Sequence, residues 1–229
     1  MRKKITICAC ASRTFIDKDK VALLATSASK AGFEVEVVSD LCELCENKDE
    51  KIHNIAQTII VACHNRAVKS LLAFVGEENC HNIDLRTKSI EQVKTELGIE
   101  TDVAVPDEAW TSEIARFKKK LGEDAWYPTI DKDQCAECGK CFEFCPFGVY
   151  EMIGDRVRVV NPHNCKNNCP ACARSCPASA IIFPKYDRGP INGGEEIQEL
   201  AIKQGSRELY GASLRDKLEY RRAGVRLKK

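Results

Sequence analysis

The residues with the clearest chemistry are the cysteines, which number 14 in a chain of 229 residues. Eight of them lie between Cys135 and Cys176 in two similar motifs. The first reads C-x2-C-x2-C-x3-C-P and ends at Pro146, and the second repeats it up to Pro177 with one extra residue in its first gap. An intracellular chain of this size does not need disulfides to fold, and the cytosol would reduce them. So many thiols therefore suggest metal binding.

The spacing fits [4Fe–4S] clusters, each of which needs four thiolates, one per iron. Three closely spaced cysteines can hold three corners of a cube from one loop, whereas the fourth, followed by proline, points the other way and binds the other cube. The motifs thus predict a crossed pair. Cluster 1 is expected on Cys135, Cys138, Cys141 and Cys176, and cluster 2 on Cys165, Cys169, Cys172 and Cys145. A zinc ribbon would explain C-x2-C pairs, but not two sets of four that each end in Cys-Pro.

With these motifs, residues 130–184 resemble the bacterial two-[4Fe–4S] ferredoxin domain. Phe147–Tyr150 and Ala178–Ile181 follow the two Cys-Pro pairs and are similar to the short pseudo-symmetric segments of that fold. The resemblance implies an α+β, ferredoxin-like two-cluster domain over residues 131–185. The stretch between Cys145 and Cys165 is longer than in a minimal ferredoxin, and Gly154-Asp155 within it predicts a β-hairpin.

The other six cysteines lie in residues 1–100, where short apolar segments alternate with helical ones. We expect strands at 5–11, 33–38, 58–62 and 83–85, and helices at 18–30, 49–57, 65–75 and 88–97. Alternation of this kind indicates an α/β domain with a parallel, flavodoxin-like sheet. Ligands of such sheets bind outside the carboxyl ends of the strands. Strand ends would bring five of the six cysteines to one edge, with Cys80 in a connection near it; the six are Cys8, Cys10, Cys42, Cys45, Cys63 and Cys80.

Three interpretations of these six thiols stay open. The segments Ile7–Cys10, Leu41–Cys45 and Val61–Arg66 make residues 5–95 similar to the amino-terminal iron–sulfur domain of heterodisulfide reductase, and this resemblance implies a third [4Fe–4S] cluster. Its candidate ligands are Cys10, Cys42, Cys45, Cys63 and Cys80, with Cys8 as a further one. Alternatively, Cys42 and Cys45 form a dithiol redox pair, since C-x-x-C at a helix start can have a lowered thiol pKa. The thiols could also be inert core residues. No G-x-G-x-x-G follows a strand, so we expect no flavin and no nucleotide.

The remaining segments connect or follow the two domains. Residues 101–130 form a predicted linker with an amphipathic helix at 107–121, whose apolar face carries Trp110, Ile114 and Phe117 or Leu121. Residues 186–229 form a basic tail, with seven basic and two acidic residues from Gly211 on. The tail is either solvated or a docking segment for an acidic partner.

Charge and hydropathy exclude several classes of protein. The net charge of +1 argues against a nucleic-acid binder, and no apolar run reaches the length of a membrane span. Without a signal peptide we expect a cytoplasmic location. We read the chain as an iron–sulfur electron-transfer protein that passes single electrons between redox partners through two or three [4Fe–4S] clusters. It would be a carrier, or a subunit of an oxidoreductase complex, and not itself an enzyme. The alternative is a heterodisulfide-reductase-like subunit whose amino-terminal cysteine site acts on a substrate.

Overall fold

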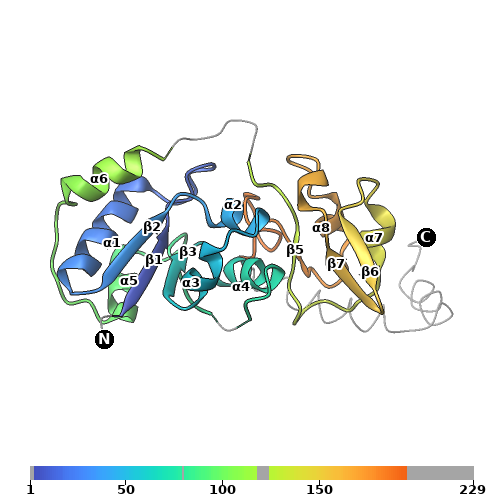
Figure 1. Ribbon diagram of the computed structural model, residues 1–229, viewed down its shortest axis with the longest axis horizontal. Coiled ribbons are helices and arrows are strands. Elements are labelled where there is room, and N and C mark those ends of the chain that lie inside the picture. Colours follow the sequence, from blue (N-terminus) through green and yellow to red (C-terminus); the bar gives the residue numbers. More distant parts are fainter. Residues whose placement is uncertain (1–2, 79, 118–123, 195–229) are drawn as a thin grey trace, which may run out of the picture.

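The computed structural model describes residues 3–78, 80–117 and 124–194. Two parts follow each other along the long axis of the molecule, an α/β part with the amino terminus and a cysteine-rich part around the β6–β7 hairpin (Figure 1). The expected α/β architecture with a parallel sheet is confirmed.

The sheet of the α/β part has four parallel strands in the order β2-β1-β3-β4. The strands are β1 (Lys4–Cys8), β2 (Glu34–Val38), β3 (Ile59–Ala62) and β4 (His81–Asp84). Strand β1 is central and pairs Ile7 with Val37 on one side and with Val61 on the other. The fourth strand starts two residues earlier than expected and ends at Asp84.

Helices cover both faces of this sheet. One apolar core contains residues of α1 (Lys18–Lys30), α5 (Ile90–Leu97) and α6 (Glu108–Ala115). The second contains residues of α2 (Leu41–Glu46), α3 (Lys51–Ala56) and α4 (Asn65–Phe74). The sequence gives no range for α2 beyond a possible helix start at Cys42, and the helix begins after the N-cap Asp40 because that carboxylate accepts the Cys42 and Glu43 backbone N–H groups.

The predicted linker helix is present as α6, whose Ile114 is buried while Trp110 and Phe117 pack against the same core. The end of the expected helix, with Leu121, lies outside the described residues, and so does the tail from residue 195 on. Within the described residues, no helix is long and apolar enough to cross a membrane.

The cysteine-rich part consists of two small antiparallel sheets and short helices. Strand β5 (Thr129–Ile130) pairs with β8 (Ile181–Ile182), and β6 (Tyr150–Ile153) pairs with β7 (Arg156–Val159). The second pair is the expected hairpin, which turns at Gly154 and Asp155. Helix α7 (Lys140–Phe144) contains Cys141 of the first motif, and α8 (Ala171–Ser175) contains Cys172 of the second. A 3-10 helix spans Pro162–Asn164. Trp126 stacks on Phe183 in the core of this part, with ring centroids 5.2 Å apart.

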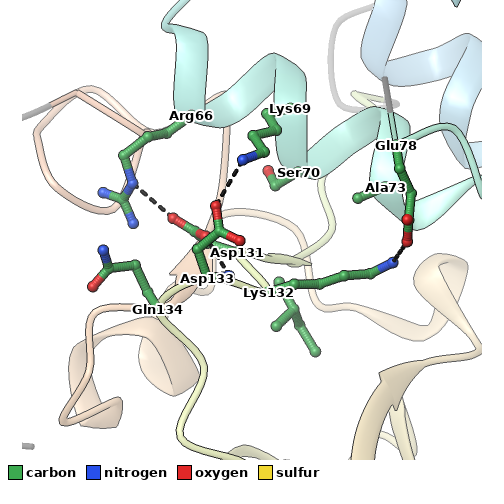
Figure 2. Close-up of a pocket in the computed structure, with 10 residues that line it drawn as sticks. Arg66, Lys69, Ser70, Ala73, Glu78, Asp131, Lys132, Asp133 and Gln134 are labelled. Carbon is green, nitrogen blue, oxygen red and sulfur yellow. Dashed lines mark hydrogen bonds and ion pairs between the residues drawn. The ribbon is translucent and has the colours of Figure 1, made fainter. Parts of the chain in front are cut away.

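Charged side chains join the two parts. Figure 2 shows a polar cleft between α4 and the residues after β5, where Arg66 contacts Asp131 at 2.9 Å and Lys69 contacts Asp133 at 2.6 Å. Lys132 and Glu78 are paired across the same cleft at 2.8 Å. These pairs connect α4 and the loop after it to the cysteine-rich part, and the Arg66–Asp131 pair is the largely buried one.

Segment 183–194, which includes the first residues of the predicted tail, also packs on the α/β part. Arg86 donates to the backbone carbonyls of Pro184 and Tyr186. Gly193 has φ +87 and lies so close to α4 that a Cβ there would be 2.7 Å from the Ala67 nitrogen. Only glycine satisfies both the left-handed backbone and this close approach.

Candidate iron–sulfur sites

One cavity of the cysteine-rich part contains the four thiols expected for cluster 2. Cys145 lies at the end of α7 and reaches the same cavity as the three thiols of the second motif, which are Cys165, Cys169 and Cys172. The rest of the lining is apolar except for Tyr150, and includes Pro128, Phe144, Pro146, Phe147, Val149 and Ala171. This donor set fits a [4Fe–4S] cube, because such a site needs four thiolates and a shell that limits access of water.

The thiols of the first motif have Cys176 as a neighbour. The pKa of Cys135 is raised to about 11, by burial first and also by the nearby Cys176 and Cys138 sulfurs. The pKa of Cys141 is raised to about 12, again by burial first and then by Cys176. Cys176 follows α8, as Cys145 follows α7, and the two helices pack together. The fourth cysteine of each motif therefore lies near the first three cysteines of the other motif.

Hydrogen bonds reach sulfurs of both motifs. The Tyr150 hydroxyl donates to Cys172 Sγ at 3.1 Å, and the Ala180 N–H donates to Cys176 Sγ at 3.3 Å. Burial, followed by the charge of nearby Cys172, raises the pKa of the Tyr150 phenol well above its usual value. The phenol therefore keeps its proton and remains a donor. Such bonds stabilise negative charge on the ligand sulfur and adjust the redox potential of a cluster.

Burial is also the main cause of the pKa shifts of Cys165 and Cys172 in the second motif. It raises the pKa of Cys165 to about 12 and that of Cys172 to about 11, and neighbouring sulfurs add to both shifts. Without metal these thiols are protonated at neutral pH. A coordinating metal deprotonates its thiol ligands outright, so assembly of a cluster on these thiols would release protons.

A second group of thiols lies at the carboxyl edge of the four-stranded sheet. Cys8 ends β1, Cys63 follows β3, and Cys42 lies in the first turn of α2 after β2. The pKa of Cys63 is raised to about 12, by burial first and then by Cys10. The pKa of Cys42 is raised well above normal by burial and Asp40, with smaller effects of Cys63 and Cys8. The structure thus brings together Cys8, Cys10, Cys42 and Cys63.

Charged groups adjoin these four thiols. The Asp40 carboxylate is paired with the Lys185 ammonium at 2.7 Å, and it also accepts a hydrogen bond from the Ser12 hydroxyl. The Arg86 guanidinium, held over the Phe15 ring at 4.0 Å, favours the charged forms of Cys10 and Cys63. A cation beside a thiolate stabilises its charge.

Two other predicted ligands, Cys80 and Cys45, have different positions in the fold. Cys80 precedes β4, and because β4 is parallel to its neighbours this residue stands at the amino edge of the sheet, opposite the four thiols. Cys45 is one turn of α2 beyond Cys42 and is fully buried in the core that contains Cys8, Cys42 and Tyr127. The structure therefore groups Cys8 with Cys10, Cys42 and Cys63, places Cys45 deeper in the adjoining core, and puts Cys80 at the far edge of the sheet.

The dithiol interpretation of Cys42 and Cys45 required lowered thiol pKa values, and the shifts have the opposite sign. Burial, followed by the Asp40 carboxylate, raises the pKa of Cys45 to about 12 and that of Cys42 well above normal. The helix start is present as expected, but burial and the N-cap carboxylate outweigh its favourable dipole.

His64 follows Cys63 and is a structural residue here. Its Nδ1 lies 3.2 Å from the Asp84 carboxylate, which also accepts the Thr87 hydroxyl and N–H. Burial opposes ionisation of Asp84, but these partners outweigh it and lower its pKa to about 2.

Within the described ranges, no three or more His, Cys, Asp or Glu side chains converge closely enough to hold a single metal ion. A cube is held at four separate corners, so its ligands surround it rather than meet at one point.

Sequence reasoning missed Tyr150, Asp40 and Lys185 as functional groups. Tyr150 follows a Cys-Pro motif by a few residues and could have been noticed as the only hydroxyl in an apolar segment. Asp40 precedes Leu41 in the position of an N-cap residue, which was a usable signal. Lys185 carries no local signal, since it meets Asp40 across 145 residues.

Comparisons with known proteins agree with this chemistry. The profile of a family described as "4Fe-4S binding domain" matches residues 127–150. An uncharacterised ferredoxin of Methanocaldococcus jannaschii is 45% identical over 69 residues, which are 30% of this chain and 47% of the relative. The chain thus spans about half the length of that protein.

Two further relatives are matched over more of their own length. A ferredoxin of Methanothermococcus thermolithotrophicus is 42% identical over 55 residues, which are 23% of this chain and 90% of that ferredoxin. Pyruvate synthase subunit PorD of Methanothermobacter marburgensis is 39% identical over 65 residues, 28% of this chain and 74% of the subunit. Through its cysteine-rich part, the chain belongs to the [4Fe–4S] ferredoxin family and has an iron–sulfur electron-transfer role.

Proposed function

We propose that this protein transfers single electrons through two crossed [4Fe–4S] clusters in its cysteine-rich part and a third cluster in its α/β part. The observation that carries the first half is the shared cavity of Cys145 with Cys165, Cys169 and Cys172. Cys145 comes well before Cys165 in the chain, yet it faces the thiols of the other motif. Cys176 beside Cys135 and Cys141 supports the reciprocal half of the crossing.

The third cluster is proposed on Cys8, Cys10, Cys42 and Cys63. Four thiols at the ligand-binding edge of a parallel sheet, with cations beside them, form a donor set that suits iron and sulfide. The strand order β2-β1-β3-β4 supports the flavodoxin-like arrangement in which this edge carries ligands. The resemblance of residues 5–95 to the heterodisulfide reductase domain stays a prediction.

Packing suggests the order in which electrons pass. Cys165 contacts the apolar core of the cysteine-rich part and also the core formed by α2, α3 and α4. That second core contains Cys42, Cys45 and Tyr127, whose hydroxyl donates to the Cys42 carbonyl at 2.9 Å. Cluster 2 is therefore the one nearest to the α/β part. Electrons would pass from cluster 1 to cluster 2 and on to the third cluster, or in the reverse direction.

The partners are proposed to be redox proteins, as part of an oxidoreductase complex. One relative is a subunit of pyruvate synthase, and by analogy this chain would carry electrons to or from the catalytic component of a complex. The domain division proposed from sequence also stays a proposal: an α/β domain over 1–100, a linker over 101–130, a two-cluster domain over 131–185 and a basic tail.

The crossing is tested by a matched pair of variants in the full chain, purified without oxygen. Cys145→Ser should remove the cube of Cys165, Cys169 and Cys172, and Cys176→Ser should remove the cube of Cys135, Cys138 and Cys141. Each variant should lose about four of the irons and a different paramagnetic resonance signal of the reduced protein. Assignment uses Cys169→Ser and Cys138→Ser, which lie within one motif each. The crossing is refuted if Cys145→Ser loses the same signal as Cys138→Ser.

The third cluster is tested by iron and acid-labile sulfide per chain. Three clusters give twelve irons and two give eight. Cys63→Ala should reduce twelve to about eight and leave both ferredoxin signals intact, whereas Cys80→Ala, the matched control at the other edge of the sheet, should keep twelve. Eight irons in the unmodified protein after anaerobic reconstitution would contradict the third cluster and leave the crossed pair standing.

A further inference from the structure

We infer that the cysteine-rich part controls the redox potential of the third cluster through Lys185, a buried ammonium group that it inserts beside the four thiols of the α/β part. This inference rests on the proposed third cluster. In it, the charges of Lys185 and Asp40 adjust the redox potential of that cluster without binding it.

The Lys185–Asp40 ion pair is buried. The side chain of Lys185 is 3% exposed and that of Asp40 is 4% exposed, with 2.7 Å between Nζ and Oδ2. Lys185 comes two residues after Phe183, which is buried in the core of the cysteine-rich part, and Asp40 is the N-cap of α2. A buried pair of this kind is not a strong source of stability, because desolvation of both charges offsets their attraction. Its position at the thiols points to an electrostatic purpose.

Backbone hydrogen bonds of Leu41 and Cys42 place the pair beside two of the four thiols. The Cys42 N–H donates to the Asp40 carboxylate at 3.0 Å, and the neighbouring Leu41 N–H donates to Cys8 Sγ at 3.3 Å. Lys185 favours the thiolate forms of Cys42 and Cys10, and Asp40 disfavours them. The two charges therefore act on the thiols with opposite signs, from fixed positions in the same buried volume.

The expected effect on the redox couple follows from charge alone. When the site gains one electron, its net charge becomes more negative by one unit. A nearby cation stabilises the reduced form more than the oxidised form and raises the potential, whereas a nearby anion lowers it. Low exposure keeps both effects large, because water screens little here. With both charges present the effects partly cancel, and loss of either one should be visible.

The experiment is an anaerobic redox titration of the full chain, followed by paramagnetic resonance of the third cluster. Lys185→Met should lower its potential, and Asp40→Asn should raise it, since asparagine keeps the N-cap but removes the charge. The double variant K185M/D40N should return close to the unmodified value. Lys69→Met, which removes a lysine from an exposed ion pair with Asp133, is the matched control and should shift nothing.

The outcomes separate this inference from the proposed function. Twelve irons per chain with opposite shifts in the two single variants, and return in the double variant, support it. Twelve irons with no shift, or with shifts of the same sign, overturn it and leave the third cluster in place. Eight irons and no third signal in the unmodified protein overturn the third cluster and this inference together. A merely structural role would change melting temperature and iron content, but would not give shifts of opposite sign that cancel.

Discussion

Replacement of Tyr150 by phenylalanine is the sharpest test of how the fold adjusts a ferredoxin cluster. The hydroxyl is buried, with the residue 2% exposed, and donates to Cys172 Sγ at 3.1 Å. Tyr150→Phe removes this one donor and keeps the ring in the apolar core around Val149 and Val157. In the proposed cluster 2, the Cys172 sulfur would lose a hydrogen bond that is stronger when the cluster carries more negative charge.

The size of the effect follows from that difference in strength. Hydrogen bonds between neutral groups contribute about 0.5–1.5 kcal/mol and those to charged groups about 1.5–3 kcal/mol, so one added electron changes the bond by roughly 1 kcal/mol. At about 59 mV per tenfold change, or per about 1.4 kcal/mol, the potential of cluster 2 should fall by roughly 40 mV. The potential of cluster 1 should move much less.

The assay is a redox titration of the reconstituted full chain, with the resonance signals of the two cubes resolved. Tyr127→Phe is the matched control, since this tyrosine is equally buried but donates to the Cys42 carbonyl rather than to a sulfur of either motif. It should leave the potential of cluster 2 unchanged. An unchanged potential in Tyr150→Phe, or equal shifts in both variants, would refute the reasoning that the phenol acts through Cys172.

Two further predictions concern the joining of the two parts, both read as thermal midpoints of the full anaerobic protein, where about 1 kcal/mol corresponds to about 2–4 °C for a chain of this size. Gly193→Ala should lower the midpoint by clearly more than Gly154→Ala. Both glycines have positive φ, but of the two only Gly193 would place a Cβ 2.7 Å from a backbone atom, the Ala67 nitrogen. Equal losses would mean that segment 189–194 does not dock on α4 as described. Arg66→Ala should lower the free energy of unfolding by roughly 2–3 kcal/mol, because it removes the largely buried ion pair with Asp131 and the hydrogen bond to the Ser179 carbonyl. Lys69→Ala should change it little, since the Lys69–Asp133 pair is solvent-exposed. An equal loss in Lys69→Ala would contradict this reasoning.

Local patterns were sufficient to predict much of the fold. Helix α1 was expected over the residues that it occupies, from its helical composition and from Gly32, which at φ +87 allows the chain to turn after its end. The structure adds the N-cap Asp17 at its start. The alternation of apolar and helical segments predicted the parallel sheet, since strands joined by helices must run in one direction. The hairpin was predicted by Gly154-Asp155 between two strand segments.

The ferredoxin motifs were readable for a similar reason. Three thiols within seven residues, from Cys135 to Cys141, are held together by the chain itself, so their spacing already indicates three corners of a cluster. The apolar face of α6 was also predicted, because helical period alone places Trp110 and Ile114 on the buried side.

Only the tertiary structure decided which amino-terminal thiols meet. The sequence places Cys80 near the fourth strand, but only the direction of β4 in the sheet shows that Cys80 lies at the amino edge. Cys8, Cys10, Cys42 and Cys63 meet at the carboxyl edge. The sign of the thiol pKa shifts at Cys42 and Cys45 likewise depends on burial, which the four-residue C-x-x-C pattern does not report. Lys185 reaches Asp40 across 145 residues of chain, and contacts over such a separation exist only once both parts have packed together.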